Sequence, residues 1–283
     1  MENYKAQGVH VIYGSSVGDV QRYLESTPKK WPSNSARAGY NSGSSWDLNA
    51  GWDGAMKMAK NGWSEGAKRL AASLEVLMPP NAKETETKYD VAGYFPDVGR
   101  FVSGDPACMI SRGRVRGHAP VVNIVVGLTT SGGVSAQCYA NFGAALTNMI
   151  DKLEAGGRRV ELTIMFPNAM LNQRVLAGWR VKAAEDHCDL SAVAFAIAHP
   201  AAYRRLGFGL WEHAEASNYP GSGYGRCVPF TKNDAALMGL EEPLIINAEM
   251  MKLQVCQTPQ AAAKFAAQQI NLAAGEQLVE IEQ

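Results

Sequence analysis

The chain has no long apolar run, no closely spaced cysteines and no excess of either charge. Nowhere do about 18 apolar residues stand together, and the N-terminus lacks a basic stretch followed by an apolar one. We therefore expect a cytoplasmic protein that makes no membrane contact. Lys and Arg together number 27, as do Asp and Glu, so the formal net charge is zero. This balance argues against a broad, non-specific nucleic-acid-binding surface.

The cysteines give no sign of a metal site. They are few, they form no CxxC pair, and no histidine stands at a zinc-finger spacing from them. The five are Cys108, Cys138, Cys188, Cys227 and Cys256. We expect reduced, mostly buried thiols and neither a metal nor another cofactor.

The 283 residues contain enough apolar side chains for a folded core, since 46% are hydrophobic and 19% are charged. Residues 27–50 are rich in Ser, Asn, Gly and Pro without an apolar period, which is typical of a loop. The apolar spacing that follows predicts two helices before Pro79. We expect residues 1–119 to form a helical and irregular region packed on a domain of residues 120–283.

From Val121 onward, strand-like and helix-like segments alternate. VVNIVVGL is typical of a buried central strand, and the spacing of residues 138–154 predicts a helix. RRVELTIMF then returns as a second strand parallel to the first. VLAGWRVKAAE follows too soon for another crossover, so we expect it to be antiparallel, in a hairpin at the sheet edge.

The remaining segments are two helices split at Pro200, the strand PLIINAE, a helix beginning near Pro259 and a last edge strand at QLVEIEQ. Together these elements predict an α/β fold, a Rossmann-like three-layer sandwich with one antiparallel strand. The order, with its antiparallel hairpin after the first crossover, resembles the von Willebrand factor type A (vWA) fold. The resemblance covers residues 120–283.

The vWA family typically holds a metal ion on an Asp-x-Ser-x-Ser loop after its first strand. On that pattern, the Asp position is Thr129, the first Ser is Ser131 and the second Ser position is Gly133. In the later segment PLIINAEM, where the family usually has an Asp after its strand, the sequence has Asn247-Ala248-Glu249. Divalent cations such as Mg²⁺ prefer carboxylate oxygens, so the resemblance implies a vWA-like domain with an eroded metal site.

The loop TTSGGVSA also has other interpretations. Free backbone N–H groups before a helix can bind phosphate, although neither GxGxxG nor GxxxxGK[ST] is present. A tight turn with Ser135 as the helix N-cap is the simpler interpretation. Because open α/β sheets bind ligands at the carboxyl ends of their strands, Thr129, Ser131 and Ser135 are the candidate ligand or partner loop.

Two carboxylates could complete this site. Asp186 and Asp189 follow a strand end and could face the Ser131 loop across the top of the sheet. The alternative is that they are ordinary helix caps, with Asp189 or Ser191 capping the next helix. We prefer capping, and no residue is assigned as catalytic.

A separate basic patch is possible. Arg112, Arg114 and Arg116 alternate, so in an extended strand they would project from one face toward phosphates or an acidic partner. A charged edge strand that resists aggregation explains the pattern equally well. The pair Arg204-Arg205, beside Tyr203 and Phe208, could extend the patch, although packing of arginine stems on aromatic rings is the commoner reason for such a cluster. Trp31, Trp46 and Trp52 could stack on single-stranded nucleic acid.

The chain also resembles uncharacterised proteins encoded by tailed bacteriophages. The resemblance lies in the repeated Trp and Gly spacing from Trp52 to Gly66 and in the segments PDVGRFVSGDP and AHPAAYRRLGF. The favoured hypothesis is a non-enzymatic, phage-associated adaptor or assembly factor that binds a protein partner. The alternatives are a nucleic-acid-binding accessory of replication or transcription, and a small-molecule enzyme that uses the loop at residues 129–135.

Overall fold

The structure, a computed structural model, describes residues 1–27, 47–77, 88–91, 95–111, 121–170, 173–214 and 227–275. Most of the loop expected at residues 27–50 and the whole strand expected at QLVEIEQ lie outside the described residues. Among the helices that are described, none combines the length and the apolar character needed to cross a membrane.

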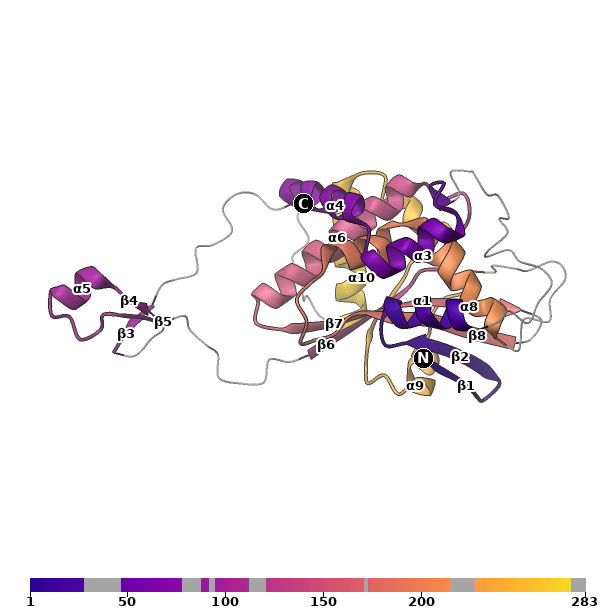
Figure 1. Cartoon of the computed structure of the whole chain (residues 1–283), viewed down its shortest axis with the longest axis horizontal. Helices are drawn as coiled ribbons and strands as arrows, with labels where there is room; N and C mark the ends of the chain where they lie inside the picture. Colours follow the sequence, from indigo (N-terminus) through magenta and orange to yellow (C-terminus); the bar gives the residue numbers. More distant parts are fainter. Residues whose placement is uncertain are drawn as a thin grey trace.

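A six-stranded mixed sheet organises the fold, in the order β1-β2-β8-β7-β6-β9 (Figure 1). Its strands are β1 (Glu2–Ala6), β2 (Val9–Gly14), β6 (Val121–Gly127), β7 (Arg159–Met170), β8 (Gln173–Lys182) and β9 (Leu244–Asn247). β6 and β7 are parallel and are joined by helix α6 (Ala136–Ala155), which confirms the predicted crossover. β8 is antiparallel to β7, also as predicted.

The sheet is wider than predicted because the N-terminal residues join it. β2 pairs in parallel with β8, and β1 pairs antiparallel with β2, so the expectation of a β7–β8 hairpin at the sheet edge is wrong. Gln7 and Gly8 have positive φ angles of 49° and 79°, as a tight two-residue hairpin turn requires. This Gln-Gly pair and the β-branched run after it are a hairpin signal that the assignment of residues 1–119 missed.

The longer helices share one apolar core with one face of the sheet (Figure 1). They are α1 (Val17–Ser26), α3 (Gly51–Asn61), α4 (Ser64–Leu77), α6 and α10 (Pro259–Ala274). The short helix α9 (Lys232–Leu237) lies on the opposite face. Its Ala235, together with Phe230 just before the helix, packs on Val11, Val125, Met165 and Leu176. The expected three-layer sandwich is therefore uneven among the described residues, with one thick helical layer and one thin layer.

Several predicted helices are confirmed. α3 and α4 form the helical pair before Pro79, and Gly62 separates them with a φ of 73°. The helices on both sides of Pro200 are also present, as α7 (Leu190–Val193) with η2 (Ala194–Ala198), and as η3 (Ala202–Gly207) with α8 (Phe208–His213). η2 and η3 are π-helical, a conformation that is rare and often found at functional sites.

A small second sheet forms between α4 and β6. It contains β3 (Lys88–Asp90), β4 (Phe95–Pro96) and β5 (Met109–Ser111), with helix α5 (Val98–Val102) between β4 and β5. Figure 1 shows it lying apart from the six-stranded sheet. None of its side chains whose exposure is described is buried, so this part of residues 1–119 does not pack over the core as expected.

A buried ion pair fixes the start of α3 against η3. The Nε of Arg205 donates to Asp47 Oδ2 at 2.7 Å, and both residues are completely buried. The same carboxylate oxygen accepts the backbone N–H of Gly51 in the first turn of α3. A buried guanidinium needs such a partner because desolvation of an unpaired charge is costly.

Replacing Asp47 with Ala should therefore lower the free energy of unfolding by about 3–5 kcal/mol, since Arg205 would be left buried without its carboxylate. Urea denaturation of the purified chain measures this difference. The control is Asp53→Ala, which removes an exposed carboxylate from α3 itself. Equal effects of the two substitutions would show that the ion pair is not buried as described.

Candidate binding edge of the sheet

The candidate loop connects the carboxyl end of β6 to the start of α6. Its last residue, Ser135, is the N-cap of α6, and its side chain accepts the backbone N–H of Cys138 at 3.4 Å, which confirms the capping prediction. The backbone of Ser131 donates to the carbonyl oxygen of Met250 at 2.7 Å, and Met250 in turn donates to Thr129 at 2.9 Å. The loop is thereby held against the chain that follows β9.

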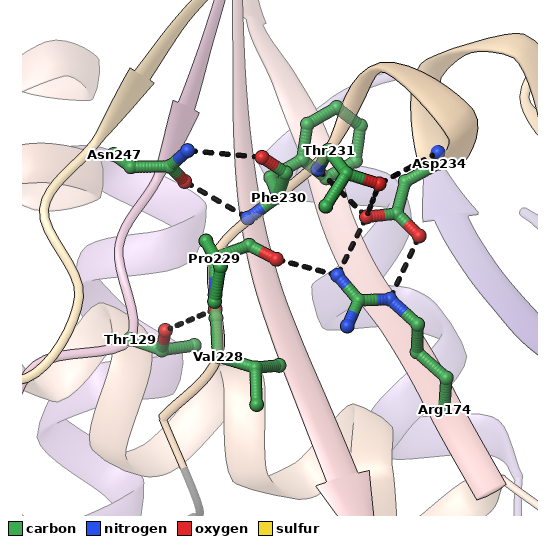
Figure 2. Close-up of polar contacts among 8 residues, drawn as sticks. All are labelled: Thr129, Arg174, Val228, Pro229, Phe230, Thr231, Asp234 and Asn247. Atoms are coloured by element: carbon green, nitrogen blue, oxygen red, sulfur yellow. Dashed lines mark hydrogen bonds and ion pairs between the residues drawn. The ribbon is translucent and has the colours of Figure 1, made fainter.

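Thr129 is completely buried, and its hydroxyl is engaged within the protein. It donates to the carbonyl oxygen of Val228 at 3.1 Å (Figure 2). Asn247, the last residue of β9, makes two hydrogen bonds to the backbone of Phe230, two residues after Val228 (Figure 2). Its Oδ1 accepts the backbone N–H of Phe230 at 2.8 Å, and its Nδ2 donates to the carbonyl oxygen of Phe230 at 2.9 Å.

We call residues 228–231 the clamped segment. Gly127 leaves room for the amide of Asn247, because a Cβ atom at Gly127 would lie 2.5 Å from Asn247 Oδ1. On the other side of the segment, Arg174 of β8 donates to the carbonyl oxygen of Pro229 and to both carboxylate oxygens of Asp234. The clamped segment is thus tied to three strands of the sheet, β6, β8 and β9 (Figure 2).

These contacts involve residues at the metal-site positions that the vWA resemblance implied. The predicted alignment put Thr129 at an Asp position and Asn247-Ala248-Glu249 near another. The side chains of Thr129 and Asn247 bind the backbone of the clamped segment. The Oγ of Ser131 accepts the backbone N–H of Gly133 at 3.3 Å. Within the described part of the chain, no three His, Cys, Asp or Glu side chains lie close enough together to hold a metal ion.

Buried polar side chains lie beneath the loop. Nη2 of Arg204, in η3, donates to the carbonyl oxygen of Ser131 at 3.0 Å, and its guanidinium lies 5.7 Å from the centre of the Tyr139 ring. Burial raises the pKa of Tyr139 to about 12, and burial also raises the pKa of the Cys227 thiol. Both groups therefore stay protonated at neutral pH, unlike the thiolate of a nucleophilic cysteine.

The placement of Asp186 and Asp189 beside the Ser131 loop is wrong. Both residues follow β8. Because β8 is antiparallel to β7, the carboxyl end of β8 and the Ser131 loop lie at opposite ends of the strands. The side chain of Asp189 accepts the backbone N–H groups of Ser191 and Ala192, which confirms its role as the N-cap of α7. Asp186 is exposed at that same edge.

The structure describes only part of the predicted basic and aromatic surface. Arg112, Arg114 and Arg116 lie outside the described residues, as do Trp31 and Trp46. The other three predicted members are within the fold: Arg204 and Arg205 are buried, and Trp52 packs against the core. The two arginines therefore do not extend a surface patch. The alternative, packing of arginine on aromatic side chains, agrees better with Arg204, whose guanidinium lies 5.7 Å from the centre of the Tyr139 ring.

Apolar side chains are exposed beside the loop. Met250 is 59% exposed, Val255 is 54% exposed, and Met251, whose Cε lies near Gly133, is partly exposed. We call these three residues the methionine patch. Glu249 and Lys252 form an ion pair at 2.6 Å next to it. The predicted site did not include this patch, although its Met-Met pair directly follows the predicted strand PLIINAE.

A family described as a domain of unknown function (DUF7192) matches residues 5–263. The chain belongs to this family. The DUF7192 match runs from β1 into α10 and includes both the region expected before residue 120 and the α/β core after it. No curated protein and no solved structure matches the chain.

The clamped segment gives a direct prediction for stability. Asn247→Ala should lower the free energy of unfolding by about 1–3 kcal/mol, because two hydrogen bonds are lost and the Phe230 backbone is left unpaired. Thermal or urea denaturation measures the change. Asn123→Ala is the matched control, since Asn123 is also a strand amide but makes only a long bond of 3.5 Å to Glu241. A loss no larger than that of the control would contradict the clamp.

Proposed function

We propose that this protein is a non-enzymatic, protein-binding adaptor built on a vWA-like α/β domain, with its partner surface at the carboxyl edge of the sheet. The surface consists of the methionine patch and the adjoining Ser131 and Gly133. The vWA likeness rests on the order of elements. In the sheet, the neighbouring strands β8-β7-β6-β9 begin with β8, which is antiparallel to β7. The phage association rests on the resemblance of the sequence segments alone.

The observation that carries the proposal is the exposure of Met250, Met251 and Val255 beside a rigid loop. Exposed apolar side chains that are contiguous mark protein interaction sites more often than single ones do. Methionine side chains are flexible and polarisable, which suits them to partner surfaces. The carboxyl edge is also where open α/β sheets usually bind their ligands.

The internal contacts of the loop favour binding over catalysis. Thr129, Ser131 and Asn247 direct their polar atoms to the backbone of the protein itself, so they have little to offer a reacting group. Tyr139 and Cys227 are held in their neutral forms by burial, which raises the pKa of both. A rigid loop flanked by apolar side chains suits recognition of a folded partner, which needs little rearrangement.

The test is affinity capture with the full chain from lysate of its native host, read by mass spectrometry. The variant Met250→Glu/Met251→Glu places two charges in the proposed surface. Capture of a defined partner should fall by at least about tenfold, because charges in an interface core are poorly tolerated. Unchanged unfolding temperatures would show that the variant still folds.

Leu272→Glu is the control, because Leu272 is 77% exposed on α10 and lies outside the patch. It should capture the partner as the parent chain does. Capture that is equal in all three proteins would contradict the proposal. Loss of the captured material on nuclease treatment would favour the nucleic-acid alternative, and loss on chelation alone would favour a metal-dependent site.

A further inference from the structure

Strand β9 is the last strand on one side of the six-stranded sheet. Within the described part of the chain it pairs with β6 alone, so the outer side of the strand has no neighbour. Ala248 directly follows β9, and its backbone N–H donates to the carbonyl oxygen of Gly127 in β6 at 2.8 Å. Because backbone groups point to alternate sides along a strand, Ile245 and Asn247 direct their N–H and C=O groups outward.

The two outer strands of the sheet differ in how they are protected. β1 carries the charged side chains of Glu2 and Lys5. β9 has the sequence LIIN, and its pairing with β6 is regular, so it has no charge, no proline and no bulge. Natural sheets usually protect an outer strand with such features against pairing with another chain. The outer side of β9 is therefore open to a further strand.

The chain that follows α10 is poorly placed to supply that strand. α10 ends at Ala274, which lies with Leu244 in a groove at the amino end of β9, so a strand from there would run parallel to β9. α10 and α6 lie on the same face of the sheet, where Phe265 packs against Phe142. The crossover to the outer side of β9 would then have the opposite hand to the crossover β6-α6-β7. Parallel crossovers almost all share one hand.

We propose that the outer side of β9 pairs with the same side of β9 in a second copy of the chain. The two strands are antiparallel and are related by a two-fold axis that passes beside Ile246. Ile245 then lies opposite Asn247 of the second copy, and the N–H of each donates to the carbonyl oxygen of the other. This pairing is self-complementary, as a closed dimer requires.

The residues on both sides of this central pair are also complementary. Pro243, which has no N–H, lies opposite Glu249 of the second copy. The carbonyl oxygen of Glu249 already accepts the backbone N–H of Lys252 at 3.2 Å, so it needs no donor from proline. The exposed Glu241 and Glu242 approach the carboxyl end of the other strand, where the side chain of Lys252 is 49% exposed. An ammonium group therefore approaches carboxylates at both ends of the pair.

Sedimentation velocity or light scattering of the full chain measures the dimer. The chain should be mostly dimeric at about 100 µM and mostly monomeric at about 1 µM, as a Kd of about 10 µM would give. Ile245→Pro removes an outward N–H at a position where an outer strand tolerates proline, and it should weaken the dimer by at least about tenfold. Ile245→Ala is the matched control, because it shortens the same side chain but keeps the N–H, and it should remain dimeric. Similar unfolding temperatures would show that both variants fold.

Hydrogen exchange at single-residue resolution, read by mass spectrometry at the same two concentrations, tests the pairing without any substitution. The amides of Ile245 and Asn247 should exchange several times more slowly at the higher concentration. The amide of Ala248, which is bonded within the sheet, should be slow at both.

Three results would overturn the proposal. Rapid exchange of Ile245 and Asn247 at both concentrations would mean that the strand stays open, and slow exchange at both would mean that the same chain covers it. A chain that is monomeric at about 100 µM would exclude the dimer. Equal weakening by Ile245→Pro and Ile245→Ala would mean that the copies associate through the side chain and not through the backbone.

Discussion

The carboxyl edge of the sheet depends on the hydrogen bonds that hold the clamped segment. Thr129, two residues after β6, and Asn247 at the end of β9 both bind its backbone, and Arg174 of β8 binds it from the other side. These bonds fix the ends of three strands and the start of α9 relative to one another. The loop at residues 129–135 and the methionine patch keep their positions because the strands beneath them are fixed in this way.

The same bonds explain why this edge suits a binding surface. Here a hydroxyl just after β6 and an amide at the end of β9 serve as ties between backbone segments. Beside these ties, the exposed side chains of the methionine patch are apolar.

Local signals in the sequence predicted the core of this fold. The apolar run of β6, the spacing of α6 and the short connection before β8 gave the right strand directions, and Ser135 and Asp189 cap helices as their sequence positions indicated. The sites were harder because they depend on distant contacts. Thr129 and Val228, which share a hydrogen bond, are 99 residues apart in the sequence. Strand β2 pairs with β8, although most of the other elements lie between the two in the sequence.

The error over Asp186 and Asp189 has a simple physical cause. Strands that run in opposite directions end at opposite edges, so the antiparallel direction predicted for β8 already excluded these residues from the Ser131 loop. The burial of Arg204 and Arg205 had only a general signal, the neighbouring aromatic residues Tyr203 and Phe208. It depends on the π-helical path of η3 and on Asp47, which lies 158 residues away.

The most direct measurement is hydrogen exchange of the Phe230 backbone amide, followed by NMR with and without added Mg²⁺. This amide donates to the side chain of Asn247, so its protection reports on the clamp alone. The account predicts slow exchange that Mg²⁺ does not change. Rapid exchange, or a signal that shifts as Mg²⁺ saturates a site at this edge, would show that Asn247 is free to serve a ligand and would contradict the account.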